Sequence, residues 1–341
     1  MNLPLPNEFR ALNPSSCSNP CLRFRTFLAF PSRWGFKVRQ GNRRVDKKAQ
    51  AWRTIVQDLN TAYQGLSGLL GHLTRRRKAL ARELERRGMA VEAFRGTVDW
   101  RLAVGLGGDH PLENGFTFHR VYGIPYLPGS ALKGLARAWR FSEIASDLKI
   151  EPLCDPDAVR GIRKNEGLTP LDALQAVLEA PSKEDVAGVA RAAAARVPRD
   201  LRNSLESLAW ADVWEKACDF RLAFGTAAVR GRVCFLDALP DADDPDAVLR
   251  FELDVVTPHY RPYYAGNGAD SPADWYSPVP SHFLTVGAGS PFGLVVYGPD
   301  EGLVRSAAGW LRRALSWGAG GKVSAGYGAI TAEPAPAAGE G

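Results

Sequence analysis

The chain has 341 residues, of which 45% are hydrophobic, 10% aromatic and 23% charged. This composition excludes an intrinsically disordered protein, and the length allows one large hydrophobic core or two smaller ones. The sequence has no run of about 18 apolar residues and no basic stretch followed by an apolar one at its start, so we expect no membrane span, no secretion and a cytoplasmic location.

Positive charge is concentrated in the first third of the chain. The formal net charge is +6, but residues 1–101 hold 20 Lys and Arg against 7 Asp and Glu, and the remainder holds 23 against 30. Such asymmetry indicates a basic face for a polyanion. The most basic stretch, residues 73–89, is also typical of an ordinary charged helix with a solvated surface, so both interpretations stay open.

The five cysteines do not resemble a disulfide framework in a chain this long. Cys17 and Cys21 form a lone C-x3-C with no second Cys/His pair nearby, which is weak evidence for zinc. We therefore expect reduced thiols, no metal site and no cofactor.

The N-terminal region, residues 1–93, divides into an arm and a helical part. Residues 1–48 are rich in Pro, Arg and aromatic residues without clear periodicity, which predicts an extended arm or an irregular segment. Between residues 49 and 88 apolar residues recur at helical spacing, which predicts one or two helices with Gly88 as a C-cap.

From residue 94 onward the pattern becomes that of β-structure. An alternating strand is predicted at 94–107, and a short strand and a turn precede a helix from about Ser130. A helical insertion is predicted at 151–217. Further strands are predicted at 220–238, 247–260 and 281–298.

The end of the chain predicts a helix at about 301–316, a glycine-rich loop, a last strand at 326–333 and a flexible tail at 334–341. The order of elements predicts an α+β domain spanning 94–333, not a parallel doubly wound sheet. The number of strands permits one or two structural units.

The glycine-rich loop lies within "WGAGGKVSAGYGAI" (317–330). It is not a P-loop, because Ser316 replaces the first required glycine and Val323 stands after Lys322, where a P-loop has Ser or Thr. A dinucleotide fingerprint fails as well, because Val323 occupies its third glycine position.

This loop follows a helix, so the negative end of the helix dipole faces it, whereas phosphate cradles precede a helix. The glycines must therefore serve backbone conformation and the close approach of another backbone, with Lys322 as the cation. RNA and a neighbouring subunit are both candidates for that backbone. The five glycines are Gly318, Gly320, Gly321, Gly326 and Gly328.

Three stretches together resemble one family. "GAGGKVSAGYG" (318–328) resembles the glycine-rich loop of RAMP proteins, the RRM-like subunits of CRISPR–Cas effectors, and "GIPYLPGSALKG" (123–134) resembles a second RAMP signature. Residues 254–286 resemble, more narrowly, the sixth-subunit family of the type III-B (Cmr) effector. The resemblance spans about residues 95–330. It departs from the pattern at Ala131, where a second Ser is common, and the basic N-terminal region has no counterpart.

This resemblance implies a ferredoxin-like (RRM-like) RAMP core and a non-catalytic role in antiviral defence. A member of this family caps the filament of RAMP subunits and contacts guide RNA (crRNA) near its 3′ end. The partners implied are guide RNA, target RNA in the complex, other Cmr RAMP subunits and the small helical subunit. No catalytic residue is implied.

The second signature has a physical interpretation of its own. Ser130 is placed where a helix N-cap is expected, and Gly129 allows a backbone to approach it. Lys133 and Arg137 are four residues apart, on one helical face, where they could hold phosphates. An ordinary capped helix with solvated cations explains the same residues.

A loop bounded by prolines carries His259, Tyr260 and Arg261. Aromatic and guanidinium planes stack on unpaired bases, but Tyr and Arg are also enriched at protein interfaces. Both interpretations stay open. The full set of RNA-binding candidates is Ser130, Lys133, Arg137, His259, Tyr260, Arg261, Lys322, Ser324 and Tyr327.

Two enzymatic alternatives remain. Some RAMP proteins are metal-independent endoribonucleases that process guide RNA, and His259, Tyr260 and Lys322 could supply acid–base chemistry if the fold brings them together. Others cleave target RNA with a loop aspartate and a metal, for which Asp254 and Asp109 are the candidates. A purely structural assembly subunit is a third possibility. A general RRM-type RNA-binding protein is disfavoured, because this sequence lacks the usual RRM signature.

Overall fold

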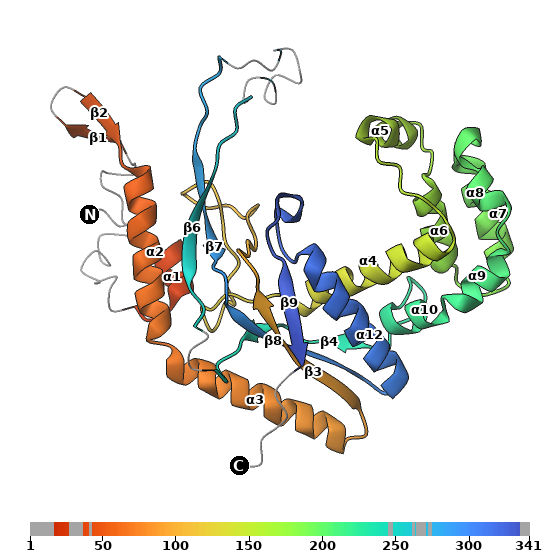
Figure 1. Ribbon diagram of the computed structural model, residues 1–341, viewed down its shortest axis with the longest axis horizontal. Helices are drawn as coiled ribbons and strands as arrows, with labels where there is room; N and C mark the ends of the chain where they lie inside the picture. The colour runs from red at the N-terminus through yellow and green to blue at the C-terminus, as the bar shows by residue number, and fades with distance from the viewer. Residues whose placement is uncertain are drawn as a thin grey trace.

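The computed structural model describes residues 17–26, 37–40, 43–244, 248–260, 263, 271 and 275–334 (Figure 1). Within this part, the centre of the molecule is a five-stranded antiparallel sheet in the order β4-β8-β3-β9, with β5 also paired to β8. Its strands are β3 (Ala90–Val98), β4 (Cys234–Phe235), β5 (Leu239–Pro240), β8 (Pro291–Gly298) and β9 (Ile330–Pro334).

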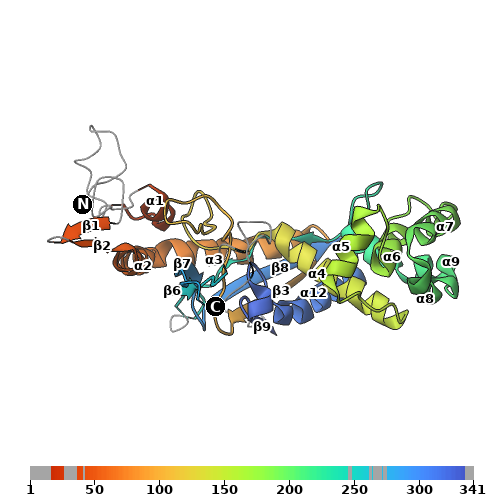
Figure 2. The same cartoon turned by 90° about the horizontal axis from the view of Figure 1, so that it is seen from above.

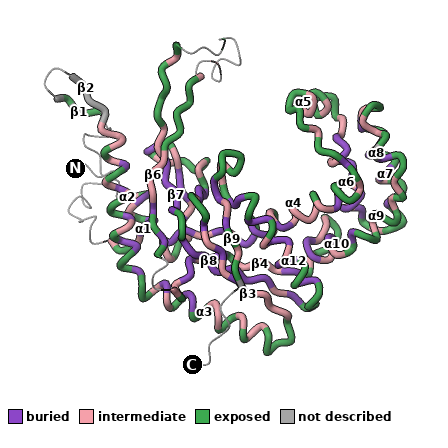
Figure 3. Tube along the Cα trace, viewed as in Figure 1, coloured by how far each residue is buried: buried purple, intermediate pink, exposed green. Residues whose placement is uncertain are grey.

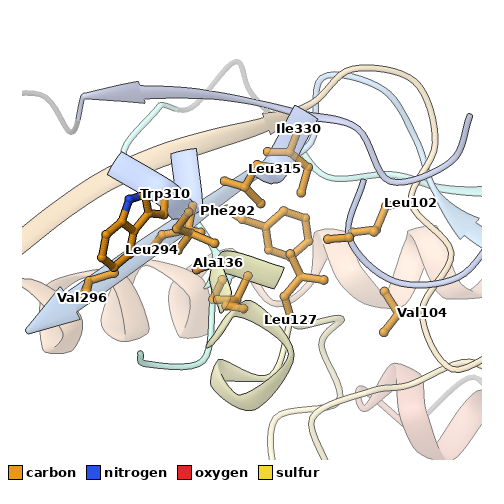
Figure 4. Close-up of a cluster of buried hydrophobic side chains, with 14 of the residues drawn as sticks. Leu102, Val104, Leu127, Ala136, Phe292, Leu294, Val296, Trp310, Leu315 and Ile330 are labelled. Carbon is orange, nitrogen blue, oxygen red and sulfur yellow. The ribbon is translucent and has the colours of Figure 1, made fainter. Parts of the chain in front are cut away.

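Alternate residues of a strand point to opposite faces of the sheet, and helices cover both faces. The even positions of β8 pack with α4 (Gly129–Asp147) and α12 (Glu301–Ala314); Figure 4 shows Phe292, Leu294 and Trp310 within that cluster. The odd position Gly293 lies under the guanidinium of Arg77, which comes from α3 (Ser67–Arg86) on the other face.

The helix α12 forms where the sequence places an N-cap before an amphipathic pattern. Asp300 accepts a hydrogen bond from the Leu303 amide at 2.7 Å, which satisfies one of the free donors of the first turn. The buried side chains recur at helical spacing, so one face of α12 joins the core. They are Leu303, Val304, Ala307, Ala308, Trp310, Leu311 and Ala314.

The N-terminal region is more regular than predicted. Two helices occupy the predicted helical stretch, which confirms their prediction, but the C-cap of α3 is Arg87, and Gly88 follows it with a positive φ of 78°. The extended arm or irregular segment predicted for 1–48 is wrong at residues 20–25, where Asn19 caps a short helix that opens with Pro20. The elements in this region are α1 (Pro20–Arg25), β1 (Lys37–Gln40), β2 (Arg43–Asp46), α2 (Lys48–Gln64) and α3.

A helical lobe occupies one end of the molecule, away from α1 and α2 (Figures 1 and 2). It contains the helices that the sequence predicted within 151–217. The strand predicted at 220–238 is wrong for its first part, which is helical: Phe220 and Phe224, four residues apart, pack on one side with ring centroids 5.4 Å apart. The helices are α5 (Pro156–Lys164), α6 (Pro170–Leu178), α7 (Val186–Arg196), α8 (Asn203–Glu206), α9 (Trp210–Lys216) and α10 (Cys218–Phe224).

A separate hairpin of β6 (Phe251–Val256) and β7 (Ser281–Val286) extends away from the sheet (Figure 1). The strand predicted at 94–107 ends at residue 98. Beyond it, Leu102 pairs with Val286 of the hairpin, and Ala103 pairs with Gly321. The segment 99–107 therefore joins the hairpin to the glycine-rich loop.

Burial follows these layers, with buried residues along the sheet and its covering helices and exposed ones at the ends of the hairpin and lobe (Figure 3). The predicted α+β class is confirmed. None of the helices in the described ranges is long and apolar enough to cross a membrane. All five cysteines are free thiols.

Candidate nucleic-acid interface

The glycine-rich loop connects α12 to β9, as the order of elements predicted, and lies between the hairpin and α12 (Figure 1). Main-chain hydrogen bonds fasten it to the segment after β3. The Gly321 amide donates to Ala103 O at 2.7 Å, and the Gly328 amide donates to Arg101 O at 2.7 Å. The loop is therefore held in one conformation by the chain itself.

Most of its glycines serve this internal packing. A Cβ at Gly320 would lie 2.3 Å from Ala103 O, and one at Gly328 would lie 1.9 Å from Ala319 O. These distances leave no room for a side chain, so the backbone that approaches closely at these positions is the protein's own. This corrects the expectation that all five glycines admit a partner backbone.

Gly326 is different from those positions. It has a φ of 86°, which favours glycine, but an added Cβ would meet no atom within 4 Å. Two residues before it, the exposed Ser324 lies within a short 3-10 helical segment, η5 (Val323–Ala325). This part of the loop is open to a partner.

Lys322 is the N-cap residue of η5 and adopts a left-handed conformation, with a φ of 59°. Its Nζ lies 5.6 Å from the ring centroid of Phe283 and 5.8 Å from that of Tyr327. Lys322 forms no ion pair with any residue that the structure describes. It is therefore a cation held against two aromatic rings, and its charge is available to an anionic partner.

Tyr327 is buried rather than displayed. Its Oη donates to Asp254 Oδ2 at 2.6 Å, and Arg101 Nη1 donates to the same oxygen at 2.7 Å. Burial, together with the hydrogen bond to Asp254, raises the pKa of Tyr327 to about 12. Burial alone would raise the pKa of Asp254, but hydrogen bonds from Tyr327, Val255 and Arg101 outweigh it and hold that pKa below its ordinary value.

Sequence reasoning missed Trp100, which neighbours this network. Its side chain is 47% exposed, and its ring centroid lies 4.9 Å from that of Tyr327. Trp100 lies inside the stretch predicted as the alternating strand 94–107, where aromatic residues are common, so the sequence did not single it out.

The second signature opens α4, but Ser130 is not its N-cap. Pro128 is the N-cap residue, and Asp237 Oδ1 accepts from the Gly129 amide at 2.7 Å. A Cβ at Gly129 would lie 2.1 Å from Phe235 O. The prediction for Ser130 is therefore wrong as to the cap, because a carboxylate distant in sequence fills that place; Ser130 itself is exposed.

Lys133 and Arg137 have different surroundings although both lie on α4. Arg137 donates to Glu179 Oε1 at 2.5 Å, and its guanidinium lies 5.1 Å from the ring of Phe220. It joins α4 to the helical lobe. Lys133 is half-buried and has no ion pair in the part of the chain that the structure describes.

His259 and Tyr260 follow β6 on the outgoing arm of the hairpin, with ring centroids 6.3 Å apart. His259 is exposed, and Arg261 lies outside the described residues. Lys322 lies over the ring of Phe283, which pairs with Asp254 in the hairpin. His259 is five residues beyond Asp254, a distance of up to about 16 Å along an extended chain. Among the described residues, no contact joins Lys322 to His259 or Tyr260.

The aspartates considered for metal-dependent cleavage are also separately placed. Both carboxylate oxygens of Asp254 are engaged, since Val255 N donates to Oδ1 at 2.8 Å. Asp109 is exposed on a loop. No cluster of three or more His, Cys, Asp or Glu suited to a metal occurs within the described ranges.

Comparison with known proteins gives concordant matches. A model of the RAMP superfamily matches residues 101–331. The CRISPR system Cmr subunit Cmr6 of Pyrococcus furiosus is 33% identical over 235 residues, which is 67% of this chain and 64% of that protein. The sequence match thus spans slightly less than two thirds of that relative's own length.

Solved structures are similar as well. The crystal structure of Cmr6 from Pyrococcus furiosus aligns with 29% identity and a TM-score of 0.41 over 72% of this chain and 99% of that one. A cryo-EM structure of the type III-B Cmr-beta complex bound to cognate target RNA contains a chain that aligns with 18% identity and a TM-score of 0.49, over 96% of this chain and 84% of that one.

Proposed function

This chain belongs to the RAMP superfamily, and from that premise we propose that it is a non-catalytic, RNA-binding subunit of a type III-B (Cmr) CRISPR–Cas effector complex. In this role it contacts guide RNA near its 3′ end and caps the filament of RAMP subunits. Its partners are guide RNA, target RNA, the other Cmr RAMP subunits and the small helical subunit. The observation that carries the proposal is the 33% identity to Cmr6, together with a family match that includes both signature stretches.

The glycine-rich loop supplies the contact with RNA. Guide sequences vary, so a useful contact must bind phosphate and sugar, which every sequence shares. Lys322 provides a positioned cation, and the open Gly326 lets a strand lie against the main chain. The exposed hydroxyl of Ser324 adds a hydrogen-bond donor between them.

A binding role, without chemistry, is supported by the state of the candidate catalytic groups. Asp254 is held in an ion pair with Arg101 and in a hydrogen bond with Tyr327, so its oxygens already have partners. His259 is exposed, and its ring lies beside that of Tyr260. Neither arrangement positions an acid–base pair around a phosphodiester.

Co-purification of the full chain from its native cell tests this proposal. We expect guide RNAs of many sequences and the other subunits of the complex to be recovered, identified by RNA sequencing and mass spectrometry. Partner chains recovered without RNA would leave a purely structural subunit. Cleavage of repeat or guide-complementary RNA that disappears in a His259→Ala or Asp254→Ala variant would instead assign an enzymatic role.

A further inference from the structure

Trp100 displays a large aromatic surface on a fixed support. Its side chain is 47% exposed, and its ring packs against the ring of Tyr327 at 4.9 Å between centroids. Tyr327 is itself buried and hydrogen-bonded to Asp254 at 2.6 Å. The indole is therefore supported from behind by a residue that is held in place.

A guanidinium completes this support. Arg101 Cζ lies 5.3 Å from the ring centroid of Trp100. Arg101 donates to Glu252 at 2.9 Å and to Asp254 at 2.7 Å, so its position is fixed by two carboxylates. A cation over an indole adds a cation–π contribution and restricts the ring.

The same tyrosine also links Trp100 to the glycine-rich loop. Lys322 Nζ lies 5.8 Å from the ring centroid of Tyr327, on which Trp100 packs. An exposed aromatic plane and a positioned cation thus meet at one buried ring. Their combination matches the two parts of a nucleotide, a base and a phosphate.

We propose that Trp100 is a stacking platform for one unpaired base of the RNA strand whose phosphate is bound by Lys322. This inference rests on the proposed function and adds a base-binding residue to it. Stacking accepts any base because every base has a π-face, so Trp100 binds guide RNA without reading its sequence.

The surroundings of Trp100 favour RNA over a protein partner. In protein interfaces a tryptophan anchor is enclosed by an apolar, well-packed surface. Of the exposed loop residues 323–326, only Val323 is larger than a serine. The carboxylates Asp254 and Glu252 are paired with Arg101, and the exposed Asp99 beside Trp100 accepts a hydrogen bond from the Thr331 amide.

Two single-stranded RNAs of equal length and charge test the platform. One carries ordinary bases, and the other carries stable abasic spacers in a central run. The wild-type full chain should bind the first roughly tenfold more tightly in fluorescence anisotropy. Trp100→Ala should remove this preference, and Trp100→Phe should keep part of it. Lys322→Ala should weaken binding of both RNAs by the same factor.

Trp275, which is 82% exposed on the hairpin arm, supplies the matched control. Trp275→Ala should keep the preference, and thermal unfolding should verify that Trp100→Ala is folded. Equal binding of both RNAs by the wild type, or a preference that survives in Trp100→Ala, would overturn the platform while leaving RNA binding intact. Loss of a partner chain from Trp100→Ala with unchanged RNA binding would overturn it in favour of a protein contact. Failure of the wild type to bind either RNA would instead refute the proposed function.

Discussion

The phenol of Tyr327 donates a hydrogen bond of 2.6 Å to Asp254, and this bond joins the glycine-rich loop to the hairpin. The two residues are 73 positions apart in sequence. Because Arg101 binds the same carboxylate from the segment after β3, three separate parts of the chain meet at one oxygen. This contact thus adds a side-chain link to the main-chain hydrogen bonds that hold the loop.

Replacing Tyr327 with Phe should destabilise the protein by about 1.5–3 kcal/mol, the usual contribution of a hydrogen bond to a charged group. The aromatic packing against Trp100 and Phe283 would remain. Urea unfolding followed by circular dichroism measures the change. A destabilisation well below this range would mean that Arg101 alone holds Asp254 and that the phenol contributes little.

The stability that Asp254 contributes should depend on pH. Its pKa is lowered below the ordinary value of 3.8, so the folded state favours the ionised form. That contribution is fully present about one unit above the unfolded pKa, that is above about pH 5, and is lost as pH falls through the folded pKa. The difference in unfolding free energy between the wild type and Asp254→Asn should therefore shrink between about pH 5 and about pH 2. A difference that stays constant over this range contradicts the assignment.

Two glycines with the same φ of 86° should respond differently to alanine. Gly326→Ala should cost about 1–2 kcal/mol, from the left-handed backbone alone. Gly320→Ala should cost clearly more, because its Cβ would lie 2.3 Å from Ala103 O. Thermal unfolding of the two variants makes the comparison. Equal destabilisation would show that Gly320 is not packed against Ala103.

Lys322→Ala combined with Lys133→Ala should weaken binding of all guide sequences alike. For single-stranded RNA, the slope of log K against log salt should fall by roughly 0.7 for each phosphate that the variant no longer binds. Arg137→Ala is the control, because Arg137 pairs with Glu179 and should change stability without changing the slope. If the double variant keeps wild-type affinity across the salt series, the loop is a protein–protein element.

Removing Arg77 should be among the more damaging changes outside the loop. Its ion pair with Asp241 is nearly buried, with side chains 12% and 7% exposed. Arg77→Ala leaves that carboxylate without its partner, which typically costs about 3–5 kcal/mol. Arg305→Ala, in an exposed ion pair with Glu301, should cost no more than about 0.5 kcal/mol. Comparable effects of the two changes in chemical denaturation would argue against burial as the cause.

Helices with clear periodicity were predicted well from the sequence, and short or aromatic segments were not. The helices at 48–64, 67–86 and 301–314 carry a repeating apolar face and end near glycine or a cap. The stretch 220–224 alternates like a strand, yet it is helical, because its two phenylalanines pack on the core at helical spacing. Local alternation cannot reveal that tertiary preference.

Part of the candidate site could likewise be predicted from the sequence, and part could not. The sequence identified the glycine-rich loop and Lys322, since composition alone marks them. It could not reveal that Asp237 caps α4 in place of Ser130, because the two segments are distant in sequence. The roles of Gly320 and Tyr327 likewise depend on Ala103 and Asp254, which only the folded chain brings near.

The position of β3 has a consequence for how the protein is made. This strand lies between β8 and β9, so its two hydrogen-bonding partners come from the last part of the chain. During synthesis β3 is complete long before residues 291–334 emerge, and both of its edges remain unpaired meanwhile. It also precedes the family-matching segment 101–331, so a fragment limited to that segment would lack the middle of its own sheet.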